Sequence, residues 1–279
     1  MWMSPEVKEA LSTMLAAMRQ PMHDPSTLPD FGLDRDFLAK TAPALEFLWA
    51  KYFRVRLLGM ENVPSTGPAL LVANHSGGLP YDGAMLMHAT HRHHPAMRPL
   101  RPLVANFAFQ SSFMRPVVAK AGGVRASMQN ALSLCAAGKL VGVFPEGLRG
   151  VGKLYRERYR LTNFGRGGFI RLARKANVPI IPVAIVGAEE THPVLGKFTR
   201  LAKPFGLPYI PITPTFPWFG PLGLLPVPTK WTISIGAPIV IPPAVEGAEN
   251  TLEAAETVRS TLDRMIAEIL ATRRSVLFG

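Results

Sequence analysis

Three short apolar runs constrain the fold of this chain most strongly. They cover residues 69–73, 140–144 and 178–186, and each is bounded by residues typical of turns. Runs of this length without alternating polar residues are typical of strands buried on both faces, as in a parallel sheet. The segments between them show helical periodicity, and strands that alternate with helices favour parallel pairing. The sequence therefore predicts an α/β fold, with a mainly parallel sheet flanked by helices.

Two amphipathic helices are expected ahead of the first strand. The first follows Ser4, a good N-cap, has Pro5 in its first turn, and repeats apolar residues at helical spacing. The second covers about residues 41–53 and combines an aromatic face with basic residues, a mixture that suits a packed core or a bilayer interface. We assign residues 1–52 to N-terminal amphipathic helices and residues 53–279 to the α/β domain.

The remaining segments differ in how regular their patterns are. Further strands are expected at residues 53–58 and 231–235, and further helices at 83–88, 127–137, 169–176 and 251–270. Residues 91–101 are rich in arginine, histidine and proline and are predicted to form a loop. Residues 207–228 carry seven prolines, which exclude a regular helix or a central strand. Apolar side chains there, among them Phe216, Trp218 and Phe219, indicate a membrane contact, with a partner contact or a cover over the core edge as alternatives.

The chain is strongly basic. Its 31 Lys and Arg outnumber its 19 Asp and Glu, which gives a net charge of +12 at pH 7. About half of the basic residues lie between positions 83 and 176, which hold sixteen Lys or Arg and two acids, Glu146 and Glu157. This excess predicts an anionic partner, and nucleic acid, anionic lipid and a phosphorylated cofactor all satisfy it.

The expected compartment is the cytoplasm. Cys135 is the single cysteine, so the chain forms no internal disulfide and suits a reducing environment. The first residues lack the basic segment and apolar core of a secretory signal, and no stretch of about 18 apolar residues occurs. We therefore expect contact with a membrane to be peripheral.

A histidine and an aspartate share one glycine-rich loop directly after the first apolar run. His75 and Asp82 lie on either side of two glycines and a proline, and Asp82 is the only carboxylate between Glu61 and Glu146. Residues at strand ends in α/β folds project into a cleft. An aspartate beside a histidine would fix the imidazole tautomer and stabilise the imidazolium. The loop therefore predicts a catalytic base with its orienting carboxylate, and the alternative is a turn-forming aspartate beside an exposed histidine.

Four more histidines cluster beyond this loop. They are His88, His91, His93 and His94. Protein zinc sites commonly combine histidine with cysteine or carboxylate ligands. No cysteine or carboxylate lies among these histidines, and two of them are adjacent, so the sequence predicts no metal site.

Four blocks in order along residues 53–240 resemble the lysophospholipid acyltransferase family, of the 1-acylglycerol-3-phosphate acyltransferase type. The blocks are residues 74–82 with the His/Asp pair, 123–125, 144–149 and 178–183. Each block is short, and their common order makes the resemblance specific. The chain departs from the family pattern in the first block, because six residues separate the histidine from the aspartate where the family usually has four.

The resemblance implies a role for each block. His75 and Asp82 would be the catalytic pair, and histidine suits a general base because it exchanges its proton near neutral pH. Acceptor and phosphate binding would fall to Arg125, Glu146, Gly147 and Arg149, and the acyl site to Val178, Pro179 and Pro182. The arginines fit this role on chemical grounds too, since their planar forks match phosphate geometry.

The expected activity is O-acyl transfer at a membrane. The acyl group would come from acyl-CoA or acyl carrier protein as co-substrate, with no other cofactor, no metal and no nucleic acid partner. The acceptor expected first is the lysophospholipid 1-acylglycerol-3-phosphate, with glycolipid or neutral glyceride as alternatives. The location expected is peripheral, on an anionic cytoplasmic membrane surface. A non-catalytic lipid-binding membrane protein is the alternative of another class, whereas the absence of a Gly-x-Ser-x-Gly motif argues against a serine esterase.

Overall fold

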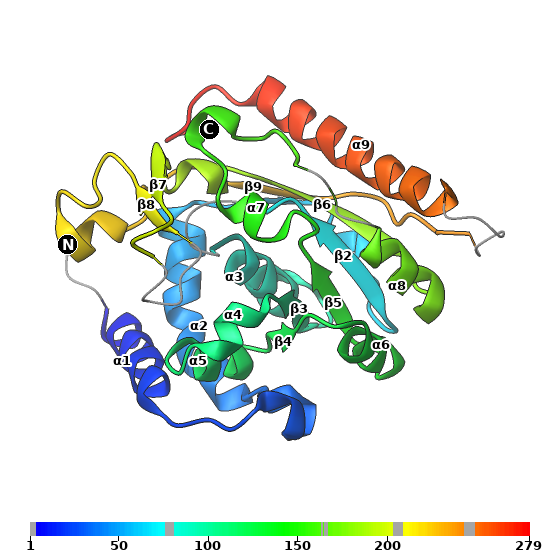
Figure 1. The fold of residues 1–279 in the computed structure, drawn as a ribbon, viewed down its shortest axis with the longest axis horizontal. Coiled ribbons are helices and arrows are strands. Elements are labelled where there is room, and N and C mark those ends of the chain that lie inside the picture. The colour runs from blue at the N-terminus through cyan, green and yellow to red at the C-terminus, as the bar shows by residue number, and fades with distance from the viewer. Residues whose placement is uncertain (1–3, 76–80, 163, 165–166, 203–208, 243–248) are drawn as a thin grey trace.

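A seven-stranded sheet forms the centre of the part of the chain that the structure describes. The structure is a computed structural model and describes residues 4–75, 81–162, 164, 167–202, 209–242 and 249–279. The strand order is β1-β9-β6-β2-β5-β3-β4, and every neighbouring pair is parallel except β6 and β9. The predicted α/β class with a mainly parallel sheet is therefore confirmed (Figure 1).

The strands of this sheet are β1 (Arg56–Leu58), β2 (Ala69–Ala73), β3 (Leu100–Val104), β4 (Val124–Arg125), β5 (Leu140–Val143), β6 (Ile180–Val186) and β9 (Thr232–Ile235). The short strands β7 (Gly196–Phe198) and β8 (Ile210–Ile212) form a separate antiparallel pair. The α-helices are α1 (Pro5–Arg19), α2 (Arg35–Phe47), α3 (Tyr81–His88), α4 (Asn106–Gln110), α5 (Met114–Lys120), α6 (Met128–Ala136), α7 (Gly147–Val151), α8 (Gly168–Ala176) and α9 (Glu249–Thr272). Two π-helical turns, η3 (Leu48–Tyr52) and η5 (Ala89–His93), continue α2 and α3.

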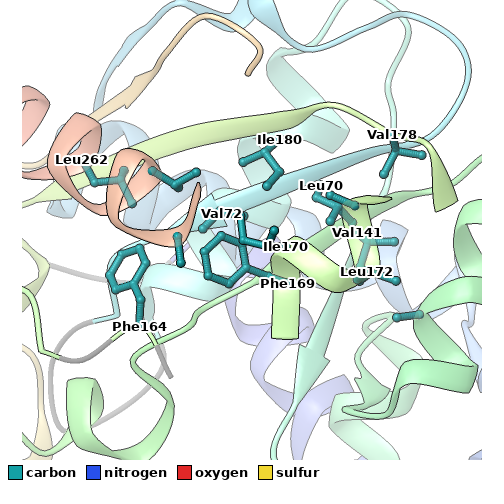
Figure 2. Packing of buried hydrophobic residues seen from close by; sticks show 14 of the residues in the cluster. Leu70, Val72, Val141, Phe164, Phe169, Ile170, Leu172, Val178, Ile180 and Leu262 are labelled. Carbon is teal, nitrogen blue, oxygen red and sulfur yellow. The ribbon is translucent and has the colours of Figure 1, made fainter. Parts of the chain in front are cut away.

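Two hydrophobic cores cover the two faces of the sheet. One packs α6, α8 and α9 against one face, with Ile170 and Leu262 buried against Leu70 and Ile180 (Figure 2). The other packs α3 and η3 against the opposite face, where Trp49 and Met85 are buried. Figure 1 shows α8 and α9 on one side of the sheet and α2 and α3 on the other. Every residue of β2 and β6 is buried, as their unbroken apolar sequences predict.

The N-terminal helices differ from the expectation in one boundary. Helix α1 begins at Pro5 with Ser4 as its N-cap, as predicted. The second helix begins at Arg35 rather than near residue 41, because the side chain of Asp34 accepts a hydrogen bond from the Phe37 N–H at 2.9 Å and caps the earlier start. Among the described residues, no helix is both long and apolar enough to cross a bilayer.

The loop prediction for residues 91–101 was wrong at both ends. The π turn η5 occupies its start, and β3 begins at Leu100 and pairs with β5. Arg101 lies within this strand and is 1% exposed. Its guanidinium pairs with the carboxylate of Asp30 and donates to the Gly122 carbonyl at 2.8 Å. A charged residue is tolerated in a buried strand here because distant residues satisfy its donors.

Candidate active site

The end of strand β2 is fixed to its neighbour by Asn74. The Asn74 side-chain amide donates to the Ile185 carbonyl at 2.9 Å and accepts from the Ile185 N–H at 2.7 Å. Asn74 is completely buried. This reciprocal pair replaces a missing rung of the sheet and sets the position from which the next residue, His75, leaves the strand.

His75 and Asp82 lie in direct contact. His75 Nδ1 is 2.6 Å from Asp82 Oδ2. Asp82 occupies the first turn of α3, is completely buried, and accepts a further hydrogen bond from the Gly83 N–H at 2.7 Å. The intervening residues 76–80 lie outside the described part of the chain. With Nδ1 committed to the carboxylate, Nε2 is the imidazole nitrogen left for a proton transfer, and the His75 side chain is 15% exposed.

Close packing surrounds His75, with one contact to its ring and another to its backbone and Cβ. The ring of Phe144, at the end of β5, has its centroid 4.6 Å from that of His75. Gly150 in α7 approaches the backbone of the same residue. A methyl group added at Gly150 would lie 2.7 Å from Glu146 Cβ and 2.9 Å from His75 Cβ. These contacts leave the histidine little freedom to move.

The carboxylate of Glu146 contacts the backbone of His75 and does not face open solvent. Its side chain is 0% exposed. One oxygen accepts from the His75 backbone N–H at 3.0 Å, and the other accepts from the Thr162 N–H and hydroxyl at 2.8 and 2.9 Å. The ammonium of Lys153 lies 3.2 Å away. These contacts support a role in positioning His75, and the acceptor contact implied by the family resemblance stays a prediction.

Lys153 extends this network to a second buried carboxylate. Its Nζ is 2.9 Å from Glu189 Oε1, and the other oxygen of Glu189 accepts from the Tyr159 N–H at 3.0 Å. Burial raises the pKa of Glu189 to about 7, and the positive charge of Lys153 opposes that shift. Sequence reasoning missed Lys153, Thr162 and Glu189. The one available signal was the position of the first two in the basic loop that follows the third block.

The two predicted phosphate-binding arginines occupy different places. Arg149 is exposed on α7, one turn from Glu146. The same short helix begins at Gly147, whose φ of +53° suits a glycine. Arg125 ends the edge strand β4, which β3 separates from β5. Its Nη2 lies 3.3 Å from Asp24 Oδ2, so the N-terminal segment already engages this guanidinium.

The predicted acyl-site residues belong to the sheet. Val178 is buried in the core that α8 and α9 cover, and Pro182 lies in β6 opposite Val72 of β2. The carbonyl of Pro179 accepts a hydrogen bond from the Leu70 N–H at 3.0 Å. These contacts define a structural role, and the acyl-site assignment stays a prediction.

The predicted membrane segment presents aromatic side chains to solvent. Trp218 is 74% exposed and Phe219 66% exposed, whereas Phe216 is partly buried. Other exposed large apolar residues in the same region are Leu195, Phe198, Leu201, Leu222 and Leu225. In Figure 1 the β7–β8 pair and α1 lie on the same side of the molecule.

Comparison with known proteins places this site in a family context. A family model described as acyltransferase matches residues 54–186. An uncharacterized protein of Mycobacterium leprae is 44% identical over 279 residues, covering 98% of this chain and 76% of that protein. The human DGAT1/2-independent enzyme synthesizing storage lipids is 27% identical over 212 residues, covering 74% of this chain and 60% of that protein. Among solved structures, the 1-acyl-sn-glycerophosphate acyltransferase PlsC of Thermotoga maritima has a similar fold, with a TM-score of 0.53 and 18% identity over 96% of this chain and 91% of that chain.

Proposed function

This chain belongs to the acyltransferase family, and from that premise we propose that it moves a fatty acyl group from a thioester donor to the hydroxyl of a lysophospholipid. The observation that carries the proposal is the 2.6 Å contact between His75 and Asp82 at the end of β2. Acyl transfer to a hydroxyl needs a base at the attacking oxygen. His75, held in place by a buried aspartate, is suited to act as that base.

The proposed reaction is a single displacement. His75 Nε2 takes the proton of the acceptor hydroxyl as its oxygen attacks the thioester carbonyl carbon. The new C–O bond forms, the C–S bond breaks, and the departing thiolate takes the proton from the imidazolium. Asp82 stabilises the imidazolium between these steps. The donor is acyl-CoA or acyl carrier protein, and the reaction needs no further cofactor.

We propose 1-acylglycerol-3-phosphate as the acceptor, bound through Arg149, Gly147 and Arg125. Exposed Arg149 stands one helical turn from the buried network, and a guanidinium binds phosphate with two parallel hydrogen bonds. The sixteen basic residues of positions 83–176 also favour an acceptor with a negatively charged group. A neutral glyceride is the second candidate, because the human relative is named for the synthesis of storage lipids.

We further propose that the protein works at the surface of an anionic membrane, peripherally and on the cytoplasmic side. The exposed side chains of Trp218 and Phe219 suit insertion at the headgroup level. Leu11 and Leu15 of α1 are 40% and 55% exposed and add apolar surface. The net charge of +12 contributes attraction to anionic lipid.

The test is transfer of a labelled acyl group from acyl-CoA to a panel of lysophosphatidate, other lysophospholipids and diacylglycerol. We expect His75→Ala to stay folded and to lose roughly 100-fold or more of the rate. The exposed His23→Ala is the matched control. Arg149→Lys should raise KM for the phosphate-bearing acceptor and leave KM for diacylglycerol unchanged. Near-parental turnover in the His75 variant, or a trapped acyl-enzyme, would overturn the mechanism.

A further inference from the structure

A second cluster of ionisable side chains lies between α2 and α3. It consists of Glu46, near the end of α2, His88, the last residue of α3, and His93, the last residue of the π turn η5. One ligand-type atom from each residue lies within 4.8 Å of the other two. The carboxylate that sequence reasoning did not find among these histidines therefore comes from another helix.

The π turn η5 brings the two histidines together. Residues five apart on an α-helix point about 140° away from each other. The hydrogen-bond repeat of a π-helix spans five residues, so His88 and His93 come onto one face. A second π turn, η3, follows Glu46 and carries Trp49. The Trp49 ring stacks on His93 with a centroid distance of 4.4 Å and an interplanar angle of 18°. Single π turns recur at functional sites, and here two of them build one cluster.

The distances from Glu46 to the two imidazoles lie on either side of the ligand spacing around a tetrahedral metal ion. Glu46 Oε2 is 2.8 Å from His88 Nε2 and 3.6 Å from His93 Nε2. Zinc holds nitrogen and oxygen ligands at about 2.0–2.1 Å, so two ligands in a tetrahedral arrangement lie about 3.3 Å apart. We propose that Glu46, His88 and His93 bind one zinc ion between α2 and α3, with water as the fourth ligand.

The exposure of the three ligands suits an ion that enters from solvent. The His88 side chain is 2% exposed, whereas those of His93 and Glu46 are 31% and 49% exposed. His88 is thus buried in the protein, whereas His93 and Glu46 are accessible to an ion and a water molecule from solvent. Two imidazoles and one carboxylate, with water in the fourth position, form a ligand set found in zinc sites. Arg92 opposes a bound cation, because its positive charge acts on His88 through a Coulomb interaction.

The proposed ion would connect the N-terminal helices to the catalytic helix. Glu46 belongs to α2, and His88 ends the helix whose first turn carries Asp82. An ion that binds the folded chain and not the unfolded chain would stabilise this connection. The site is independent of the proposed acyl transfer, because metal content and stability report on it without any substrate.

The test uses the full chain, purified without a histidine tag and dialysed against a chelator. Calorimetric titration with ZnCl₂ should give one site per chain. At a free zinc concentration of about 100 times Kd, the melting temperature should rise by roughly 5–10 °C. Co²⁺ provides a spectroscopic check, since its visible absorption responds to tetrahedral histidine and carboxylate ligation.

Two partly exposed ligands provide variants that keep the fold. We expect His93→Ala and Glu46→Gln to weaken zinc binding at least tenfold and, at the same zinc concentration, to reduce the thermal shift to about half or less. The exposed His23→Ala is the matched control and should bind as the parent does. Arg92→Ala should bind more tightly, because a nearby positive charge is removed. The proposal is overturned if the parent shows no zinc-dependent shift, or if the two ligand variants bind zinc like the parent. A lower melting temperature of Glu46→Gln, without any effect of zinc on the parent, would show instead that Glu46 and the histidines only form hydrogen bonds between the two helices.

Discussion

Replacing Glu146 by glutamine should separate a positioning role from an acceptor-binding role. In the parent, one carboxylate oxygen accepts from the His75 N–H and the other from the Thr162 N–H and hydroxyl. A glutamine amide has one oxygen and one NH₂ group. Whichever way it is turned, its NH₂ faces one of the two backbone N–H groups. The variant therefore leaves a buried backbone donor without an acceptor.

The cost follows from these contacts. An unsatisfied buried donor costs about 1–3 kcal/mol. The ion pair of Lys153 with Glu146 is also lost, although Lys153 keeps Glu189 at 2.9 Å, so the loss is smaller than for a fully broken buried pair. We expect the free energy of unfolding to fall by about 2–4 kcal/mol. Thr162→Val is the matched control, because it removes a single hydroxyl hydrogen bond to the same carboxylate and should cost about 1 kcal/mol.

Urea unfolding and steady-state kinetics on the same preparations decide between the two roles. If Glu146 positions His75, the glutamine variant loses stability and kcat falls for every acceptor, while the acceptor KM stays at the parental value. If Glu146 binds the acceptor, the acceptor KM rises and stability hardly changes. Parental stability together with a raised acceptor KM would refute the argument from the buried network.

Three further substitutions test the surroundings of the site. Gly150→Ala should lower kcat at least tenfold, because its methyl group displaces His75, the proposed base. Gly83→Ala meets its nearest atom at 3.8 Å and should leave kcat near the parental value, so equal rates in the two variants would contradict the crowding argument. The pKa of Glu189 is raised to about 7, so between about pH 4.5 and 7 the folded state keeps a proton on this group that the unfolded state has released. The free energy of unfolding contributed by Glu189 therefore falls as pH rises. Glu189→Gln should remove this pH dependence, measured by urea unfolding at several pH values. Trp218→Ser combined with Phe219→Ser should make liposome binding fully sensitive to salt, and a double variant that still sediments with liposomes at high salt would show that another surface anchors the protein.

The sheet was predictable where each strand carries its own signal. Strands β2, β5 and β6 are apolar along their length, and this pattern is enough to predict a strand buried on both faces. Strand β3 contains Arg101 and Pro102, which argue against a central strand when the segment is considered alone. Its stability depends on Asp30, which pairs with Arg101 across 71 positions of sequence. No local pattern reports such a partner, so the segment was expected to be a loop.

The candidate active site likewise contains residues with a local sequence signal and residues without one. His75 and Asp82 were predicted as a pair because one short loop holds both, and the structure brings them into contact. Thr162 and Glu189 reach the site only through the fold, and their sequence neighbourhoods resemble ordinary loop and turn. Short-range chemistry was therefore visible in the sequence, whereas the buried acid–base network that supports it was not.

The histidine cluster shows a different reason for failure, because there the helix type itself was unknown. Sequence patterns are interpreted with the 3.6-residue period of an α-helix, and on that period His88 and His93 face apart. The π turn η5 changes the period locally and brings both rings beside Glu46. A change of that turn should therefore act on the cluster as strongly as the loss of a ligand. Inserting one alanine after Thr90, which lies inside η5 and is completely buried, would lengthen the spacing to six residues and turn the two histidines about 120° apart on an α-helix. If such a variant still folds and retains zinc, the π turn is not what assembles the site.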